Sequence, residues 1–308
     1  LGLGAAEMCE LHPRLIYASV SGFGPDEMSR GRVGFDIAAQ AESGLMSVTG
    51  DPGGEPQKVG VPIIDSATTH VVAQAVLAAL FQRERTGRGM TIETSLLEVA
   101  LSLQAANFTD YLLRGVEPQR TGNGQPNNAP AAELVSTKDG AIVLSAYADD
   151  HWARFCRVFG RDDLIVDQRF CTNEARVANR AALRAALKDI LSGYTSDACV
   201  ELLTRNQIVA GVVRSYGAAR ASSAVSASGI FCRTTGGGEA DYETMGLPYR
   251  FAGVPKRSTR PLAAIGDNGV EILREAGFGE AETADLLKSG VVATPRSLAS
   301  LGDEFCET

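Results

Sequence analysis

The sequence lacks clustered cysteines, histidines at metal-ligand spacing and long apolar runs. Its six cysteines lie far apart and form no C-x-x-C pair, which argues against a disulfide framework and against a clustered zinc site. Its three histidines are scattered, and no metal-ligand spacing occurs among them. No run of about 18 uninterrupted apolar residues is present, nor a basic region followed by an apolar signal core. We therefore expect a reduced cytoplasmic protein that neither is secreted nor spans a membrane.

Positive charge is also scarce. Lys and Arg number 29 against 37 Asp and Glu, so the net charge is −8. An acidic surface repels polyanions, and neither nucleic acid nor an anionic membrane is expected as a partner. At 44% hydrophobic and 21% charged residues, the 308-residue chain is long enough to bury a large core.

The common phosphate and nucleophile motifs are absent. The sequence has no P-loop, no G-x-G-x-x-G that opens a helix, and no G-x-S-x-G elbow. The glycines at 22–24 and 236–238 are more typical of turns than of phosphate cradles. Composition and spacing alone indicate an α/β protein with a few candidate carboxylates.

Periodicity predicts helices that alternate with short strands, which favours an α/β sheet in the first part of the chain. Gly87 suits the left-handed residue that ends a helix. The predicted strands are a buried one at 15–24 and further ones at 90–95 and 141–147, and the predicted helices are 35–50, 66–83, 96–113, 150–160, 180–192, 196–205 and 269–278. The stretch 121–130 predicts a loop before a smaller second domain, 234–242 a hairpin turn, and 218–228 a mobile loop.

Two carboxylates stand at the starts of predicted helices. Asp65 ends the apolar run 61–64 and precedes a long helical stretch, so it is either the helix N-cap or a group that performs chemistry. The backbone N–H groups at a helix N-terminus hold a carboxylate ionised, and the two roles are compatible. Glu98 stands three residues after Ser95, the spacing of a capping box in which the glutamate returns to the serine backbone N–H. That structural role accounts for Glu98.

An ordered set of segments resembles the class III coenzyme A transferase family, which includes formyl-CoA transferase, carnitine CoA-transferase and α-methylacyl-CoA racemase. The matching segments are HPRLIYASVSGFG (12–24), GFDIAAQAESGLMSVTG (34–50), KVGVPIID (58–65), LAALFQRERTGRG (77–89), DQRFCTNEARVANRAAL (167–183) and IGDNGVEILREAGF (265–278). The resemblance covers essentially the whole chain.

The resemblance implies a Rossmann-like open-sheet large domain, a smaller α+β domain and an interlocked homodimer. It implies that residues 1–115 are part of the large domain, 116–215 the small domain, and 216–308 a return segment to the large domain. Family members are longer at the N-terminus, and the start at Leu1 favours a fragment.

The resemblance also implies the chemistry. The family nucleophile is an aspartate at the end of the segment that here reads KVGVPIID, so Asp65 is the match. It would attack an acyl-CoA thioester and pass through an aspartyl anhydride and an aspartyl-CoA, with coenzyme A as substrate and no metal or tightly bound cofactor. The implied coenzyme contacts are Gly34, Asp36 and Leu96.

The loop Gly122, Asn123, Gly124, Gln125 matches the mobile glycine-rich loop that closes over the active site in formyl-CoA transferase. Glycines allow close backbone approach, and their N–H groups face an oxyanion in such loops. A simple domain-linking turn is the alternative.

Position 35 separates two reaction types. Family racemases place a histidine here to exchange the α-proton, whereas Phe35 cannot carry a proton. A racemase or epimerase is therefore the weaker alternative, and His70 is expected to point away from Asp65 in a surface or packing role. Departures at Thr69, 209–213 and 266–268 leave open a third alternative, an inactive coenzyme A-binding subunit.

Overall fold

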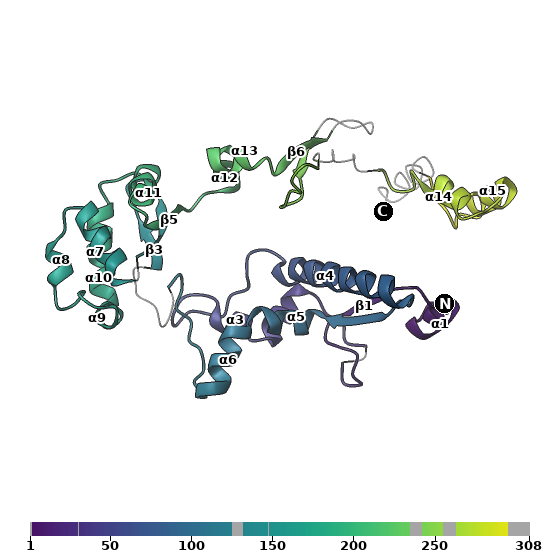
Figure 1. Ribbon diagram of the computed structural model, residues 1–308, viewed down its shortest axis with the longest axis horizontal. Coiled ribbons are helices and arrows are strands. Elements are labelled where there is room, and N and C mark those ends of the chain that lie inside the picture. The colour runs from purple at the N-terminus through teal and green to yellow at the C-terminus, as the bar shows by residue number, and fades with distance from the viewer. Residues whose placement is uncertain are drawn as a thin grey trace, which may run out of the picture. The chain divides into compact units, whose positions relative to one another are not determined.

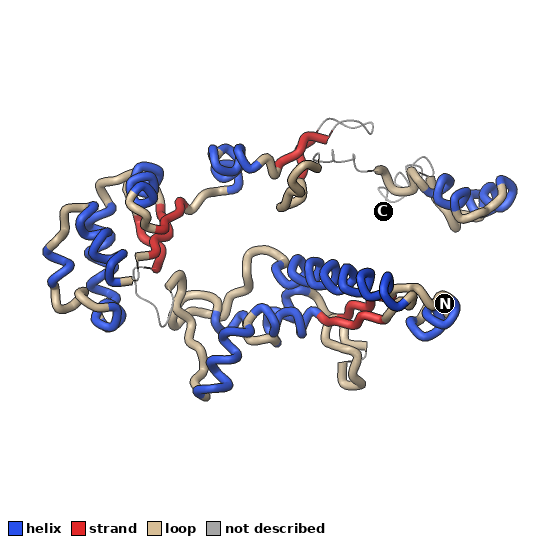
Figure 2. Tube along the Cα trace, in the orientation of Figure 1, coloured by secondary structure: helices blue, strands red, loops and turns tan. Residues whose placement is uncertain are grey.

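The computed structural model describes residues 2–29, 31–124, 132–146, 148–234, 242–254 and 263–294. The chain divides into two compact units, Leu1–Val213 and Arg214–Thr308. Figure 1 shows the order of the elements, and Figure 2 distinguishes helices from strands. The predicted return of residues 216–308 to the large domain stays a prediction.

The first unit begins with helix α1 (Ala5–Leu11) and a parallel pair of strands. Strands β1 (Tyr17–Ser21) and β2 (Thr91–Ser95) pair with Tyr17 opposite Thr91. Both strands were predicted, but the expected burial of 15–24 is wrong, because the side chains of β1 are half-buried or exposed. Among the described residues β1 pairs only with β2, so little of its surface is covered.

Helix α4 (Ile63–Thr86) connects the two strands and packs against β2. It ends as predicted at Gly87, which has φ +74° and donates its N–H to the Arg83 carbonyl. Among the described residues, α4 alone is long and apolar enough by length and composition to cross a membrane, a property shared with core helices of other folds. Helix α4 is not an uninterrupted apolar run in the sequence, because Thr, His and Gln residues interrupt it.

Two predicted helices are each divided in two. The 35–50 stretch forms α2 (Asp36–Glu42) and α3 (Leu45–Val48), because Gly44 between them adopts φ +83°. The 96–113 stretch forms α5 (Leu96–Leu103) and α6 (Ala105–Arg114), which join at Gln104. The buried Gln104 side chain donates to the Ser43 carbonyl at 3.1 Å, so the second break faces the first.

The helices α2, α4 and α5 meet in a small apolar cluster. Its buried members are Ala39, Ile64 and Ala100, one from each helix. The turn after β1 lies against the chain that enters α2, since a Cβ placed on Gly22 would be 2.7 Å from the Gly34 Cα. Glycine is required there for this close backbone contact. The start of α4 is thus held near the start of α2.

The second half of the first unit is an antiparallel sheet covered by helices. Strands β3 (Ala132–Ser136), β4 (Ala141–Ser145) and β5 (Val209–Val212) lie in the order β3-β4-β5. The helices are α7 (Asp149–Val158), α8 (Asp163–Val166), α9 (Asn173–Ala178), α10 (Arg180–Leu191) and α11 (Ser196–Arg205). The predicted strand at 141–147 and the helices at 150–160, 180–192 and 196–205 are confirmed. Their core includes Trp152, Phe155 and the leucines of α10.

The second unit contains short helices and one hairpin. Its elements are α12 (Tyr216–Ala221), α13 (Ser223–Ser228), β6 (Phe231–Thr234), β7 (Tyr242–Met245), α14 (Gly269–Glu275) and α15 (Glu280–Lys288). The predicted mobile loop at 218–228 is wrong, because Ser215 and Ser222 each cap a helix with their hydroxyls. Strands β6 and β7 are antiparallel, and the predicted turn between them falls largely outside the described residues.

Candidate functional site

Asp65 lies inside helix α4 and does not cap it. The helix begins at Ile63 after Pro62, so Asp65 belongs to the first turn and its side chain is exposed. The N-cap interpretation of Asp65 is therefore wrong. The acceptor is Asp36, whose Oδ2 accepts from the backbone N–H of Ile64 at 2.7 Å and of Asp65 at 3.2 Å. A carboxylate there neutralises the partial positive charge of the helix N-terminus.

The segment Gly34–Asp36 brings three predicted site residues to this place. Phe35 is the N-cap position of α2, with an extended backbone, and its ring is 70% exposed. Asp36 is the first residue of α2 and is half-buried. The family resemblance implies that Asp36 contacts coenzyme A. The structure shows its carboxylate bonded to the start of α4 and to Gln40.

Gln40 is a residue that sequence analysis missed. It is fully buried on α2, and its Nε2 donates to Asp36 Oδ1. Its Oε1 accepts from the backbone N–H of Val59 at 2.8 Å. The four-residue spacing between Asp36 and Gln40, which places both side chains on one helix face, was the available signal.

Leu96 and Glu98 lie at the start of α5. Leu96 packs against the apolar cluster of Ala39, Ile64 and Ala100, on the same side as the start of α4. Ser95 Oγ accepts from the Glu98 N–H at 3.1 Å and donates to Glu98 Oε2 at 2.8 Å. Ser95 is thus the N-cap of α5, and the Glu98 carboxylate accepts from the serine hydroxyl and not, as predicted, from the Ser95 N–H.

The described part of the glycine-rich loop is hydrogen-bonded to Gly50 and not to the start of α4. Gly122, with φ +61°, donates its N–H to the Gly50 carbonyl at 3.0 Å, and Thr121 Oγ1 donates to the Gly124 carbonyl at 2.6 Å. Gln125 lies outside the described residues. The Gly122 hydrogen bond connects the loop to the segment after α3, whereas those of Asp36 connect α2 to α4. A role of this loop over Asp65 stays a prediction.

An ion cluster around the buried Glu133 lies against the loop. Glu133 on β3 is 2% exposed and pairs with both Arg180 and Arg184 on α10. A Cβ on Gly124 would lie 2.8 Å from an Arg180 nitrogen, so a larger residue there would require the side chains of the cluster to shift. A cavity of about 210 Å³ opens beside it, lined by Asp51, Pro52, Thr121, Gly122, Asn123, Glu133, Leu134 and Arg184.

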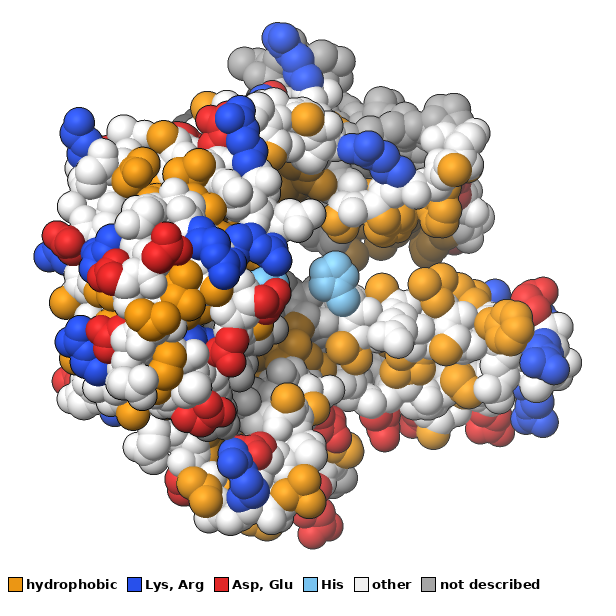
Figure 3. Space-filling view, turned by 60° about the vertical axis from the view of Figure 1, so that its left-hand side comes forward, with side chains coloured by type: hydrophobic (Ala, Val, Ile, Leu, Met, Phe, Trp, Pro, Cys, Tyr) orange, Lys and Arg blue, Asp and Glu red, His pale blue; other side chains and the backbone are white. Residues whose placement is uncertain are grey.

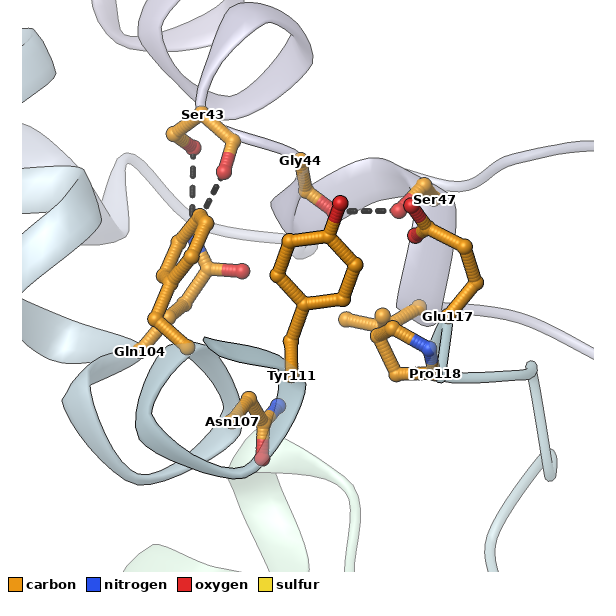
Figure 4. A pocket seen from close by; sticks show the side chains of 10 residues that line it. Ser43, Gly44, Ser47, Gln104, Asn107, Tyr111, Glu117 and Pro118 are labelled. Carbon is orange, nitrogen blue, oxygen red and sulfur yellow. Dashed lines mark hydrogen bonds between the residues drawn. The ribbon is translucent and has the colours of Figure 1, made fainter. Parts of the chain in front are cut away.

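A second cavity of about 150 Å³ lies between the α2–α3 turn and α6. Figure 4 shows Gln104, Tyr111 and Glu117 around it, with Gln104 bonded to Ser43. Asp65 and the other predicted site residues do not line it. His70 is exposed, as expected. Within the described ranges, no group of three or more His, Cys, Asp or Glu side chains is placed to hold a metal ion.

Known proteins are similar to this chain in sequence and in fold. The sequence profile described as CoA-transferase family III matches residues 1–268. The succinate–glutarate CoA-transferase of Agrobacterium fabrum is 31% identical over 89% of this chain and 68% of its own length. A probable fatty acyl-CoA transferase of Mycobacterium tuberculosis is 35% identical over 70% of this chain and 57% of its own length.

A crystal structure is similar over the same extent. A CAIB/BAIF family protein from Brucella suis superposes with a TM-score of 0.76 at 31% identity, covering 89% of this chain and 71% of that chain. The matched portion thus leaves a substantial part of each of these proteins without a counterpart here. The similarity in sequence and in fold supports the same family.

Proposed function

We propose that this chain, which belongs to CoA-transferase family III, moves coenzyme A from an acyl-CoA thioester to a free carboxylic acid through Asp65. The curated relatives with similar sequences carry names of such transferases. The donor and the acceptor acid are left open. Because the chain spans only part of its relatives, the activity is proposed for the protein that contains this chain.

Each step of the proposed reaction forms one bond and breaks one. An Asp65 oxygen attacks the thioester carbon, the C–S bond breaks, and coenzyme A leaves as the thiolate. The thiolate then attacks the Asp65 carbonyl of the mixed anhydride, which releases the donor acid and leaves an aspartyl-CoA thioester. The acceptor carboxylate repeats the sequence in reverse and regenerates Asp65.

The exposure of Asp65 at the start of α4 is the observation that carries the proposal. Asp36 bonds the N–H groups of the first turn, so these donors are already satisfied by a carboxylate other than Asp65. The Asp65 carboxylate is exposed and stays accessible to an acyl carbon. Phe35, also exposed at the start of α2, offers an apolar ring and no proton, which favours transfer over racemisation.

The larger assembly is part of the same proposal. A two-stranded parallel pair rarely stands alone, because βαβ units are normally buried on both faces. We therefore infer that β1 and β2 belong to a larger Rossmann-like open sheet. Family membership supports the further proposal of an interlocked homodimer, and the scattered cysteines support the proposal of a cytoplasmic location. No tightly bound cofactor is expected, and coenzyme A acts as the substrate.

Trapping the covalent intermediate tests the proposal. The full-length protein is incubated with a panel of acyl-CoA donors, quenched with hydroxylamine and digested for mass spectrometry. A hydroxamate on the peptide that contains Asp65 is expected, and Asp65→Asn should lose it together with at least about a thousandfold of turnover. Glu84→Gln, which changes another exposed carboxylate of α4, is the matched control and should behave as the parent protein.

The other outcomes identify the alternatives. Exchange of solvent deuterium into the α-carbon of the acyl group without acyl transfer would indicate a racemase. Neither adduct nor exchange over a broad donor panel would favour an inactive coenzyme A-binding subunit. A hydroxamate at a carboxylate other than Asp65 would contradict the assignment of the nucleophile.

A further inference from the structure

A continuous chain of hydrogen bonds joins α2 to the segment that ends on Asp65. The backbone N–H of Val59 donates to Gln40 Oε1 at 2.8 Å, and Gln40 Nε2 donates to Asp36 Oδ1. Asp36 Oδ2 then accepts from the N–H groups of Ile64 at 2.7 Å and Asp65 at 3.2 Å. Asp36 and Gln40 therefore hold the segment 59–65 near both of its ends, and we call these two side chains the α2 clamp.

The clamp replaces a cap that the local sequence does not provide. The first N–H groups of a helix have no intrahelical acceptor, and the N-cap residue Pro62 has no side-chain acceptor to offer. The acceptor is the Asp36 carboxylate, which lies 28 residues before Ile64 and 29 before Asp65 in the chain. Hydrogen bonds to a charged acceptor are stronger than neutral ones, so this contact restrains the first turn of α4.

The burial of Gln40 fixes the direction of the hydrogen bonds. Gln40 is 0% exposed, and its amide has one acceptor side and one donor side. The Val59 N–H requires the acceptor side, so the donor side must face position 36. Position 36 must in turn present an acceptor both to Gln40 and to the α4 backbone. Aspartate, with two acceptor oxygens, meets this requirement and asparagine does not.

We propose that Asp36 and Gln40 are positioning residues for Asp65. Their hydrogen bonds set the backbone position from which the Asp65 carboxylate projects, and they leave that carboxylate free by bonding the helix N-terminus in its place. This inference rests on the proposed role of Asp65 as nucleophile. Misplacement of a reacting group by about 1 Å costs up to roughly a hundredfold in rate, so the clamp contributes through geometry and not through contact with substrate.

A swap of the two functional groups tests the proposal. In Asp36→Asn, the new amide group opposes either Gln40 Nε2 or the α4 N–H groups. In Gln40→Glu, two carboxylates oppose each other. The double variant Asp36→Asn/Gln40→Glu restores every hydrogen bond. The carboxylate at position 40 accepts from the Val59 N–H and from the amide NH₂ at position 36. The amide oxygen at position 36 accepts from the backbone N–H groups of Ile64 and Asp65. Glu42→Gln is the control, because Glu42 lies on the same helix and pairs only with Arg32 at the surface.

Two independent readouts are measured. Hydrogen exchange of the peptide over 59–66 reports the clamp itself without any need for substrate. The kcat and KM for acyl transfer, with the rate of adduct formation at Asp65, report positioning. Each single variant should exchange faster and lose about ten- to a hundredfold in kcat with little change in KM, and the double variant should recover both.

The results separate the two proposals. Parent-like kcat in the folded single variants would overturn the positioning role. A double variant that fails to fold, or that exchanges and reacts no better than the singles, would overturn the clamp. If a single variant does not accumulate, the double variant compared with the parent protein decides the question. If the parent protein forms no Asp65 adduct, the function proposed for Asp65 fails, and hydrogen exchange alone decides whether the clamp restrains the segment.

Discussion

At the scale of single residues, burial decides the chemistry of the cysteines. Cys156 and Cys199 are buried in the helical core, and burial raises the pKa of Cys156 to about 12 and that of Cys199 to about 11. The thiolate is the reactive form of cysteine, and at these pKa values it is almost absent near neutral pH. Neither thiol is suited to act as a nucleophile in the folded protein.

We predict that iodoacetamide at pH 8 leaves Cys156 and Cys199 unmodified in the native protein. Cys9, Cys171 and Cys232 are half-buried and should react first, because reagent reaches them without unfolding. Peptide mass spectrometry of native and urea-unfolded samples measures the difference. Labelling of Cys156 as fast as Cys171 in native protein would contradict the burial of the thiol.

Asp139 repeats on α11 what Asp36 does on α4. Its Oδ1 accepts from the backbone N–H of Ser196 at 2.7 Å and from the Ser196 hydroxyl at 3.0 Å. These hydrogen bonds favour the ionised form and lower the pKa of Asp139 below its usual value. A lowered pKa in the folded state stabilises the protein above the unfolded-state pKa, and the stabilisation is lost as the pH falls through the folded-state pKa.

Asp139→Asn should therefore lower the melting temperature at pH 7. The difference from the parent protein should shrink below about pH 4, where the parent carboxylate also becomes protonated. Thermal unfolding by circular dichroism over a pH series measures it. Asp197→Asn, which removes another carboxylate from the first turn of the same helix, is the comparison variant. A difference that stays constant with pH would contradict the assignment.

At the scale of elements, α10 shows how a helix with an apolar face secures its own position. Leu183, Leu187 and Leu191 recur every fourth residue, and all three are fully buried against the sheet and the neighbouring helices. Helix α4 is different, since Leu77 and Phe81 are 66% and 67% exposed. Periodicity therefore predicted α10 from the sequence, and the structure shows which of its residues face the core. Helix α4 was also predicted, but some of its apolar side chains are exposed.

Leu187→Ala should lower the free energy of unfolding by about 2–5 kcal/mol, because it removes buried methyl groups and leaves a cavity. Lys188→Ala, its exposed neighbour, is the control and should change stability by no more than about 0.5 kcal/mol. Urea unfolding followed by tryptophan fluorescence reports this core directly, since Trp152 is the only tryptophan and lies within it. A loss of less than about 1 kcal/mol for Leu187→Ala would show that the core is not close-packed there.

At the scale of the whole molecule, charge and apolar surface point to different partners. The net charge of −8 repels polyanions, whereas hydrophobic side chains are exposed among charged ones on the face shown in Figure 3. The apolar side chains of α4 contribute to the exposed hydrophobic surface. Electrostatic attraction is screened by salt, but apolar contact is not, so the two kinds of binding are distinguishable.

We predict no measurable binding of the protein to double-stranded DNA or to vesicles rich in phosphatidylserine at about 0.15 M salt. Vesicle flotation and a gel-shift assay check this, with a basic protein as the positive control. Flotation that persists at high salt would contradict the prediction and would indicate that the apolar α4 enters the bilayer.

The sequence by itself determined the family and the alternation of helices and strands. Segment order and hydrophobic periodicity are local properties, and they predicted β2, α4, α10 and α11 because each element there agrees with its own pattern. It also singled out Asp65 and the aromatic residue at 35. The sequence did not predict the helix breaks at Gly44 and Gln104, because apolar spacing continues through both. It also predicted a loop where Ser215 and Ser222 cap the short helices α12 and α13.

Only the tertiary structure decided which residue caps α4. A local rule assigns the cap to the nearest carboxylate, Asp65, but the helix begins earlier, at Ile63, and leaves Asp65 inside its first turn. The acceptor comes from Asp36, which the contact between Gly22 and Gly34 and the buried Gln40 bring to the start of α4. The unpaired N–H groups at a helix start need an acceptor that is close in three dimensions, and it need not be close in the sequence. A side chain distant in the sequence therefore supplies it here.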